Sequence, residues 1–141
     1  MKEYRVLRKK YSFLEMCKNP ELAAQVTLQP IEKFKLDAAI IFSDILIPLE
    51  PMGVEFEFAK GEGPVFHHPL RERKDVEKLR VIDPEEKIPY LMKAIQIVQK
   101  EIEGKIPLIG FSGAPFTLAS YIIEGGHSKN YILTKSLMYQ D

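Results

Sequence analysis

Two short apolar runs, at residues 38–42 and 106–111, constrain the fold of this chain more than any other feature. Runs of this length predict strands that are buried on both faces, as in parallel sheets covered by helices. Between them, residues 89–102 place apolar side chains at spacings of three and four, with Gly104 where a C-terminal cap belongs, which predicts a helix. The order strand, helix, strand predicts an α/β protein with a parallel sheet.

Weaker local signals predict further elements. Residues 12–15 have the spacing of a capping box, which indicates the start of a short helix. A second helix is expected over residues 20–34, and Pro30 is expected to kink or end it. The period-two alternation of residues 54–58 predicts a half-buried strand or one arm of a hairpin. A long loop is then expected from Gly61 through Pro69.

The small number of core strands limits the architecture. After residues 106–111 the sequence predicts a turn and then helices over 116–123 and 129–139, separated by Gly125-Gly126. A two-stranded parallel ribbon cannot cover both of its faces, and a closed (β/α)₈ barrel needs about 250 residues. The chain therefore either pairs with something or is a fragment of a larger domain, and we favour the fragment.

Composition excludes several classes of protein. The 141 residues are 45% hydrophobic, which is enough for one core, and 28% charged, which argues against intrinsic disorder. Twenty Lys and Arg balance twenty Asp and Glu, so a nucleic-acid binder that relies on bulk charge is not indicated. The single cysteine, Cys17, excludes an intramolecular disulfide, and neither a signal peptide nor a membrane-spanning run is visible. These features lead us to expect a cytoplasmic protein.

Asp44 is the first candidate for chemistry. It follows the apolar run at residues 38–42 and has apolar neighbours on both sides. A carboxylate at the C-terminal end of a parallel strand points toward the crevice in which α/β proteins bind ligands. The alternative is an aspartate that serves only as a turn or N-cap residue.

Other polar residues are weaker candidates. Residues 110–115 resemble a nucleophile elbow around Ser112 but lack its final glycine, so a tight turn with close backbone approach is the better interpretation. The Tyr121 hydroxyl could reach a polar substrate group or could be buried with a local partner. His67 and His68 are expected at the surface, since no third ligand lies at metal spacing.

The remaining candidates lie near the N-terminus. Cys17 is expected to pack as a small hydrophobic residue. The basic start of the chain is interpreted either as a solvated helix face or as an arm that contacts anions, in which Arg5 and Arg8 could bind carboxylates in bidentate fashion.

Several motifs, taken together, resemble the uroporphyrinogen decarboxylase family over essentially the whole chain. They are Ala39–Leu46, Gly61–Pro64 and Pro107–Leu118, with shorter matches at Cys17–Leu22, Thr27–Pro30 and Tyr121–Gly126. The resemblance implies that residues 1–141 are the N-terminal part of a single (β/α)₈ TIM-barrel domain, with its first two barrel strands, their helices and an inserted hairpin. It also implies a cytoplasmic homodimer that removes carbon dioxide from the four acetate side chains of uroporphyrinogen III, giving coproporphyrinogen III, without a metal or an organic cofactor.

The resemblance also assigns site residues. Asp44 matches the family's central aspartate, which accepts hydrogen bonds from the pyrrole N–H groups and stabilises the positive charge of a protonated ring. Tyr121 matches a substrate-contacting tyrosine, and Arg8 and Phe13 match positions that line the entrance. The family's R-Q-A-G-R-Y segment would immediately precede Met1, and a later hydroxyl residue and histidine would follow residue 141. We therefore expect a fragment that is inactive by itself.

Two other functions stay open at this point. A corrinoid-linked methyltransferase of the same superfamily would need a zinc-bound thiolate, for which Cys17 lacks a ligand partner at suitable spacing. A non-catalytic half-barrel that docks to a partner would instead use exposed strand edges and apolar surface.

Overall fold

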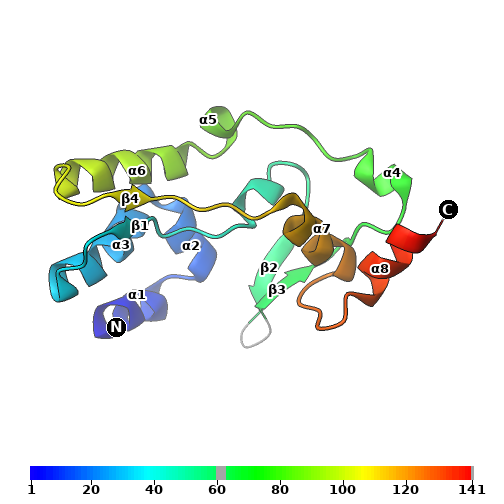
Figure 1. Ribbon diagram of the computed structural model, residues 1–141, viewed down its shortest axis with the longest axis horizontal. Helices are drawn as coiled ribbons and strands as arrows, with labels where there is room; N and C mark the ends of the chain where they lie inside the picture. The colour runs from blue at the N-terminus through cyan, green and yellow to red at the C-terminus, as the bar shows by residue number, and fades with distance from the viewer. Residues whose placement is uncertain (60–62, 141) are drawn as a thin grey trace. The chain divides into compact units, whose positions relative to one another are not determined.

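The computed structural model describes residues 1–59 and 63–140, and these form two compact units (Figure 1). Unit 1 consists of Met1–Ile47 and Pro84–Ser112. Unit 2 consists of Pro48–Asp83 and Gly113–Asp141. Each unit therefore combines two stretches that are distant in the sequence.

Unit 1 is built around a short parallel pair of strands. Its elements are α1 (Lys2–Lys10), α2 (Phe13–Lys18), α3 (Pro20–Phe34), β1 (Ala39–Ile40), α5 (Pro84–Lys87), α6 (Pro89–Ile102) and β4 (Leu108–Ile109). Ala39 pairs with Leu108 and Ile40 with Ile109, in parallel. The parallel pairing of the two apolar runs, with a helix between them, is confirmed.

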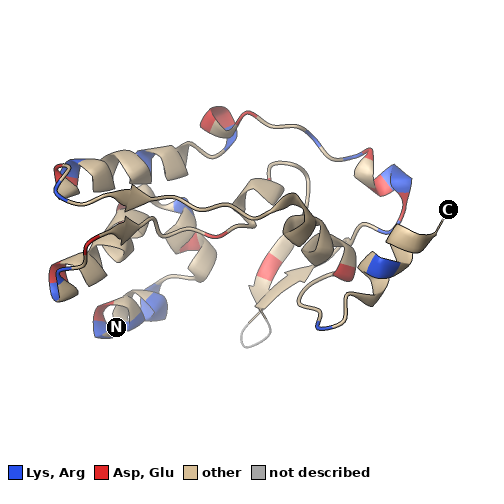
Figure 2. Cartoon of the chain, in the orientation of Figure 1, with Lys and Arg blue, Asp and Glu red and all other residues tan. Residues whose placement is uncertain are grey.

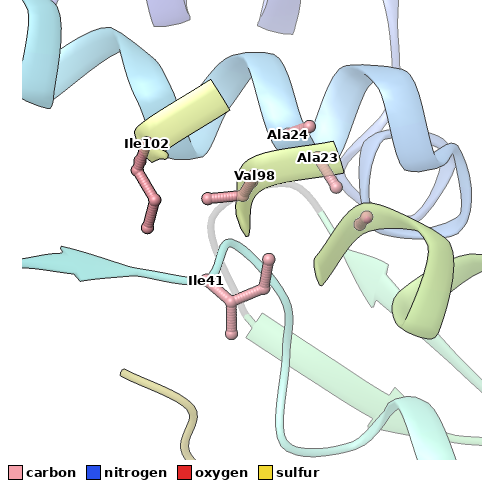
Figure 3. Close-up of a cluster of buried hydrophobic side chains, with 6 residues drawn as sticks. Ala23, Ala24, Ile41, Val98 and Ile102 are labelled. Atoms are coloured by element: carbon pink, nitrogen blue, oxygen red, sulfur yellow. The ribbon is translucent and has the colours of Figure 1, made fainter. Parts of the chain in front are cut away.

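Helices α3 and α6 pack on β1 to make the core of this unit. The cluster is closed by small and branched side chains, of which five are labelled in Figure 3. Its buried members are Ala23, Ala24, Ile41, Ala94, Val98 and Ile102. The alanines of α3 let its axis approach the strand closely, while α6 supplies the larger side chains from its predicted apolar stripe.

The two strands are covered on one face only. Ala39 is fully buried, whereas Ile40 is 60% exposed and Ile109 is 47% exposed. The expectation of strands buried on both faces is therefore wrong for the residues that the structure describes. The reason is that α3 and α6 both lie on the face of Ala39 and Ile41, and successive strand residues point to opposite faces.

Capping residues determine where the N-terminal helices begin. Ser12 Oγ accepts the Glu15 N–H at 3.2 Å and Glu15 Oε2 accepts the Ser12 N–H at 2.6 Å, which confirms the capping box.

Pro30 does not end α3, which runs on to Phe34 and closes at Lys35 in the left-handed conformation. The proline removes one backbone donor, but the last turn keeps its own bond, from Lys35 N–H to the Ile31 carbonyl at 3.0 Å.

The basic start of the chain is the helix α1, and Figure 2 shows its lysine and arginine residues in blue. None of its residues is buried, and Arg8, Lys9 and Lys10 occupy its last turn. Cations there interact favourably with the carbonyl end of a helix. This segment is therefore a solvated helix face, and contact of Arg5 and Arg8 with anions stays a prediction.

Unit 2 contains a hairpin and three helices. Its elements are β2 (Phe56–Ala59), β3 (Gly63–Phe66), α4 (Arg73–Val76), α7 (Pro115–Glu124) and α8 (Ile132–Tyr139), with the 3₁₀ turn η1 (Ile47–Leu49) where the sequence passes from unit 1. The strands β2 and β3 are antiparallel, with Phe56 opposite Phe66. The predicted hairpin arm at residues 54–58 is confirmed.

The expected loop at residues 61–69 is only partly correct. Residues 61 and 62 lie outside the described part, and residues 63–66 form β3 instead. A contact distant in sequence supports this strand: Val65 bridges to Gly126, and Phe66 N–H donates to the Gly125 carbonyl at 3.1 Å. Residues 129–131 precede the last helix, which starts at Ile132.

None of the helices formed by the described residues has the length and apolar character that crossing a bilayer requires.

Candidate active site

Asp44 lies in the turn that follows β1. Its side-chain Oδ1 accepts the N–H of Leu46 at 2.8 Å, and its carbonyl accepts the N–H of Ile47 at 3.3 Å. Aspartate favours such turns because its carboxylate can bond to the backbone two residues later. Leu46 and Ile47 are both buried, so this turn is anchored in unit 1 and Asp44 is held half-buried at its start.

Burial controls the electrostatics of this carboxylate. Loss of hydration raises the pKa of Asp44, and the hydrogen bond from Leu46 acts in the opposite direction but is weaker. No salt bridge to Asp44 forms among the residues that the structure describes. An anion in this situation gains most from a cationic or N–H-rich ligand, because such a ligand replaces the hydration it has lost.

Arg8 and Phe13 lie together beside the segment that leads to Asp44. The Arg8 guanidinium lies 6.0 Å from the centre of the Phe13 ring, and that ring meets the Phe42 ring edge-on, with centroids 5.7 Å apart. Arg8 Nη1 also donates to the Tyr11 carbonyl at 3.0 Å, which holds the side chain between α1 and α2. Three of the four predicted site residues thus belong to one part of unit 1.

The sequence analysis missed two aromatic members of this group. Phe42 contacts Phe13, and the Tyr4 ring lies edge-on to Phe42 with centroids 6.1 Å apart. From the sequence, Phe42 is expected only as part of an apolar strand and of the matched segment Ala39–Leu46, and Tyr4 lies in a segment that stands out only for its charge. For Tyr4, the signal in the sequence was an aromatic side chain next to a basic one, Arg5, in α1.

Cys17 is a buried neighbour of this site. It is 1% exposed and packs with Ile47 and Ile88, so the prediction of a small packed residue is confirmed. Burial, assisted by the negative charge of Asp44, raises the pKa of the thiol to about 12, although Arg8 and Lys18 act in the opposite direction. Because zinc binds the thiolate form, Cys17 is a poor zinc ligand. The described residues contain no group of three potential metal ligands.

Tyr121 belongs to unit 2 and is described within that unit. It lies on α7, and its carbonyl accepts the N–H groups of Gly125 and Gly126 at 3.0 and 3.1 Å where the helix ends. Its half-buried side chain lines a cavity of about 70 Å³. The other lining residues are Phe116, Thr117, Ser120, Gly126, His127, Ser128 and Tyr131.

A larger cavity in unit 2, of about 490 Å³, is mainly apolar and contains none of the predicted site residues. His67 and His68 are exposed on the hairpin side of the same unit, 4.0 and 3.9 Å from Glu57 and Glu55, as expected for surface histidines.

Comparison with known proteins connects this geometry to a family. The sequence model of the family described as uroporphyrinogen decarboxylase matches residues 1–141. A protein of Sorangium cellulosum named uroporphyrinogen decarboxylase is 62% identical over 141 residues, and one of Carboxydothermus hydrogenoformans is 64% identical over 140 residues. These alignments cover 100% and 99% of this chain but 40% of each relative. The chain thus spans about two fifths of the length of these curated relatives.

A solved structure has a similar fold. The methyltransferase from Methanosarcina mazei matches 86% of this chain and 36% of its own, with a TM-score of 0.63 and 24% sequence identity. At that identity the likeness concerns the fold alone.

Proposed function

The chain belongs to the uroporphyrinogen decarboxylase family, and on that basis we propose that it forms the part of a uroporphyrinogen decarboxylase that supplies the active-site carboxylate, Asp44. One observation carries the proposal more than any other. Asp44 is a half-buried carboxylate with a raised pKa and without a cationic partner among the described residues, in the turn after a parallel strand.

The reaction explains why such a carboxylate is useful. For the carboxyl group of an acetate side chain to leave as carbon dioxide, its pyrrole ring must first be protonated at carbon so that the ring can accept the electron pair of the broken C–C bond; a proton then converts the remaining CH2 into a methyl group. The ring becomes cationic in that step, and its N–H groups become stronger donors. Asp44 accepts hydrogen bonds from them, and partial burial strengthens the attraction because water screens it less.

The neighbouring residues have matching roles in this proposal. Arg8 binds a carboxylate of the substrate, which carries several, and Phe13 lines the entrance with an apolar ring. The cation–π contact of Arg8 with Phe13, at 6.0 Å, supports a shared role for the two residues. Tyr121 contacts a polar group of the substrate through its hydroxyl. In this proposal the whole enzyme needs neither a metal nor an organic cofactor for the reaction.

We further propose that residues 1–141 are the N-terminal part of one (β/α)₈ barrel domain, in which β1 and β4 are the first two barrel strands. The parallel pairing of these strands, the helix α6 between them and the fold likeness to the methyltransferase support this arrangement. The exposed faces of Ile40 and Ile109 support it as well, since barrel strands are covered on both faces. The whole protein would act as a cytoplasmic homodimer.

A chimera tests the function directly. Residues 1–141 replace the matching segment of the Carboxydothermus hydrogenoformans protein, and the purified chimera is given uroporphyrinogen III under reducing conditions. We expect coproporphyrinogen III to form at a rate similar to that of the unaltered protein, while the isolated 141-residue chain forms none. A chimera that folds, with an unchanged circular dichroism spectrum, but forms no product would contradict the proposal and favour a non-catalytic half-barrel.

A further inference from the structure

Thr27 connects helix α3 to the backbone that leads from β1 to Asp44. Its Oγ1 donates to the Ala23 carbonyl at 2.8 Å and accepts the N–H of Phe42 at 2.9 Å. The residue is only 3% exposed. The bond to Ala23 is therefore buried, and the bond from Phe42 is partly buried.

The Phe42 N–H needs this acceptor because the strand pairing does not supply one. Ile41 N–H donates to the Ile109 carbonyl at 3.1 Å, toward β4. Successive N–H groups of an extended chain point in opposite directions, so the next one points away from β4. A buried backbone donor without a partner is strongly unfavourable, and Thr27 removes that penalty at this position.

The geometry of α3 makes this acceptor rigid. Because the hydroxyl proton is used in the bond to Ala23, an oxygen lone pair is left for Phe42. Ala23 and Ala24 carry no side chain beyond Cβ and belong to the same buried cluster as Ile41, which allows the helix and the strand end to approach closely. The position of residue 42 is thus fixed relative to α3.

Asp44 then lies between two anchors. Upstream, Thr27 holds residue 42, and downstream, the N–H of Leu46 holds the carboxylate itself at 2.8 Å. We propose that Thr27 is a positioning residue: it directs the Asp44 carboxylate toward the substrate without touching the substrate. This inference rests on the proposed function of Asp44.

The test compares two substitutions in the chimera described above. Thr27→Val keeps the shape of the side chain but removes the hydroxyl, whereas Thr27→Ser keeps the hydroxyl. We expect Thr27→Val to lower kcat by about 10-fold to 100-fold, with a much smaller change in KM, because small displacements of a catalytic group have effects of that order. Thr27→Ser should keep most of the kcat of the parent chimera. If Thr27→Val does not fold, Thr27→Cys replaces it, since a thiol is a weak acceptor.

A matched control separates positioning from a general loss of stability. Thr134 is also 3% exposed, and its hydroxyl bonds to Glu124 Oε1 at 2.8 Å in unit 2. Thr134→Val should lower the thermal midpoint to a similar extent while kcat changes by less than about twofold. An equal loss of kcat in the Thr134→Val and Thr27→Val chimeras would overturn the inference.

Repeating Thr27→Val in an Asp44→Asn background identifies the path of the effect. If Thr27 acts through Asp44, Thr27→Val should lower kcat of the Asp44→Asn chimera by less than about twofold. If the two residues act independently, Thr27→Val should lower kcat by the same factor in both backgrounds. A full loss in both backgrounds, or no loss in either, overturns the role of Thr27 and leaves that of Asp44 intact. If Asp44→Asn alone keeps full activity, the proposed function of Asp44 fails, and the positioning role of Thr27 fails with it.

Discussion

Replacing Asp44 with asparagine in the chimera removes a charge and almost no volume. Asparagine keeps the Oδ1 oxygen that accepts the Leu46 N–H, so the turn should survive. Two opposite unit charges about 4 Å apart near a protein surface attract by about 4 kcal/mol. If the pyrrole cation loses that interaction, kcat should fall on the order of 1000-fold. The assay is coproporphyrinogen III formation at saturating substrate.

The same substitution should not weaken the fold at neutral pH. Burial raises the pKa of Asp44, so the folded chain holds this proton more tightly than the unfolded chain does. The stabilising contribution is therefore complete in acid, below the ordinary pKa, and is lost as the pH rises through the raised value. At pH 7 the ionised carboxylate opposes folding, and the asparagine variant should unfold at an equal or higher temperature than its parent.

The kcat and the thermal midpoint of the Asp44→Asn chimera together test whether the charge of Asp44 serves function rather than stability. A large loss of kcat with unchanged or increased thermal stability is expected of a charge that is kept for function. If kcat stays within tenfold of the parent, or if the thermal midpoint of the variant falls clearly at pH 7 but not in acid, the electrostatic argument for Asp44 is wrong.

The remaining predictions concern packing and reactivity in the chimera. Gly126→Ala should destabilise it by about 1–3 kcal/mol in urea denaturation, because an added Cβ would lie 2.8 Å from the Pro64 carbonyl oxygen and the backbone φ is +152°. The control is Gly110→Ala, whose added Cβ has no neighbouring atom within 4 Å in the structure and which should cost less than about 0.5 kcal/mol. Cys17 should resist iodoacetamide at pH 8 until the protein is unfolded, as followed by mass spectrometry; rapid labelling of the folded protein would contradict its buried position and its pKa of about 12. Val98→Ala should cost about 2–3 kcal/mol, from two methyl groups and the cavity they leave, and a loss below about 0.5 kcal/mol would show that this core is not closely packed.

Much of unit 1 could be predicted because its signals are local. The capping box at Ser12 and the apolar stripe of α6 depend on residues within a few positions of one another, and both gave correct elements. The parallel pairing followed from the order of two apolar runs and a helix. The sequence could not show that Ile40 would be exposed, because covering its face requires a layer of structure that the described residues do not include.

The second strand of the hairpin illustrates the opposite case. Gly63 and Pro64 are typical of loops, and nothing nearby in the sequence opposes that interpretation. They form a strand because β2 lies beside them and because Val65 bridges to Gly126, more than sixty positions later. Contacts at that separation have no local pattern, so pattern analysis predicted a loop.

The candidate site shows the same division. Asp44 could be found because it directly follows a predicted strand, but neither its raised pKa nor its bond to Leu46 could be inferred from position alone. Thr27 gave no signal beyond its place in the matched segment Thr27–Pro30: a threonine on an amphipathic helix is unremarkable until its partner, the Phe42 N–H, is known. Thr27 and Phe42 are fifteen positions apart, the first in α3 and the second in the segment after β1.

The energetics of Asp44 explain why the surrounding backbone is anchored so firmly. A carboxylate that loses hydration on folding would gain free energy by turning outward into water. The bond from the Leu46 N–H to Oδ1 opposes that movement at the side chain, and the bond from the Phe42 N–H to Thr27 Oγ1 opposes it at the backbone two residues earlier. A loop that was free to relax would let the carboxylate rehydrate, and its attraction for a cationic ring would weaken to that of a surface group. On the proposed function, the buried hydroxyl and the half-buried carboxylate are therefore two parts of one arrangement, which keeps a charge poorly hydrated for a substrate cation to solvate.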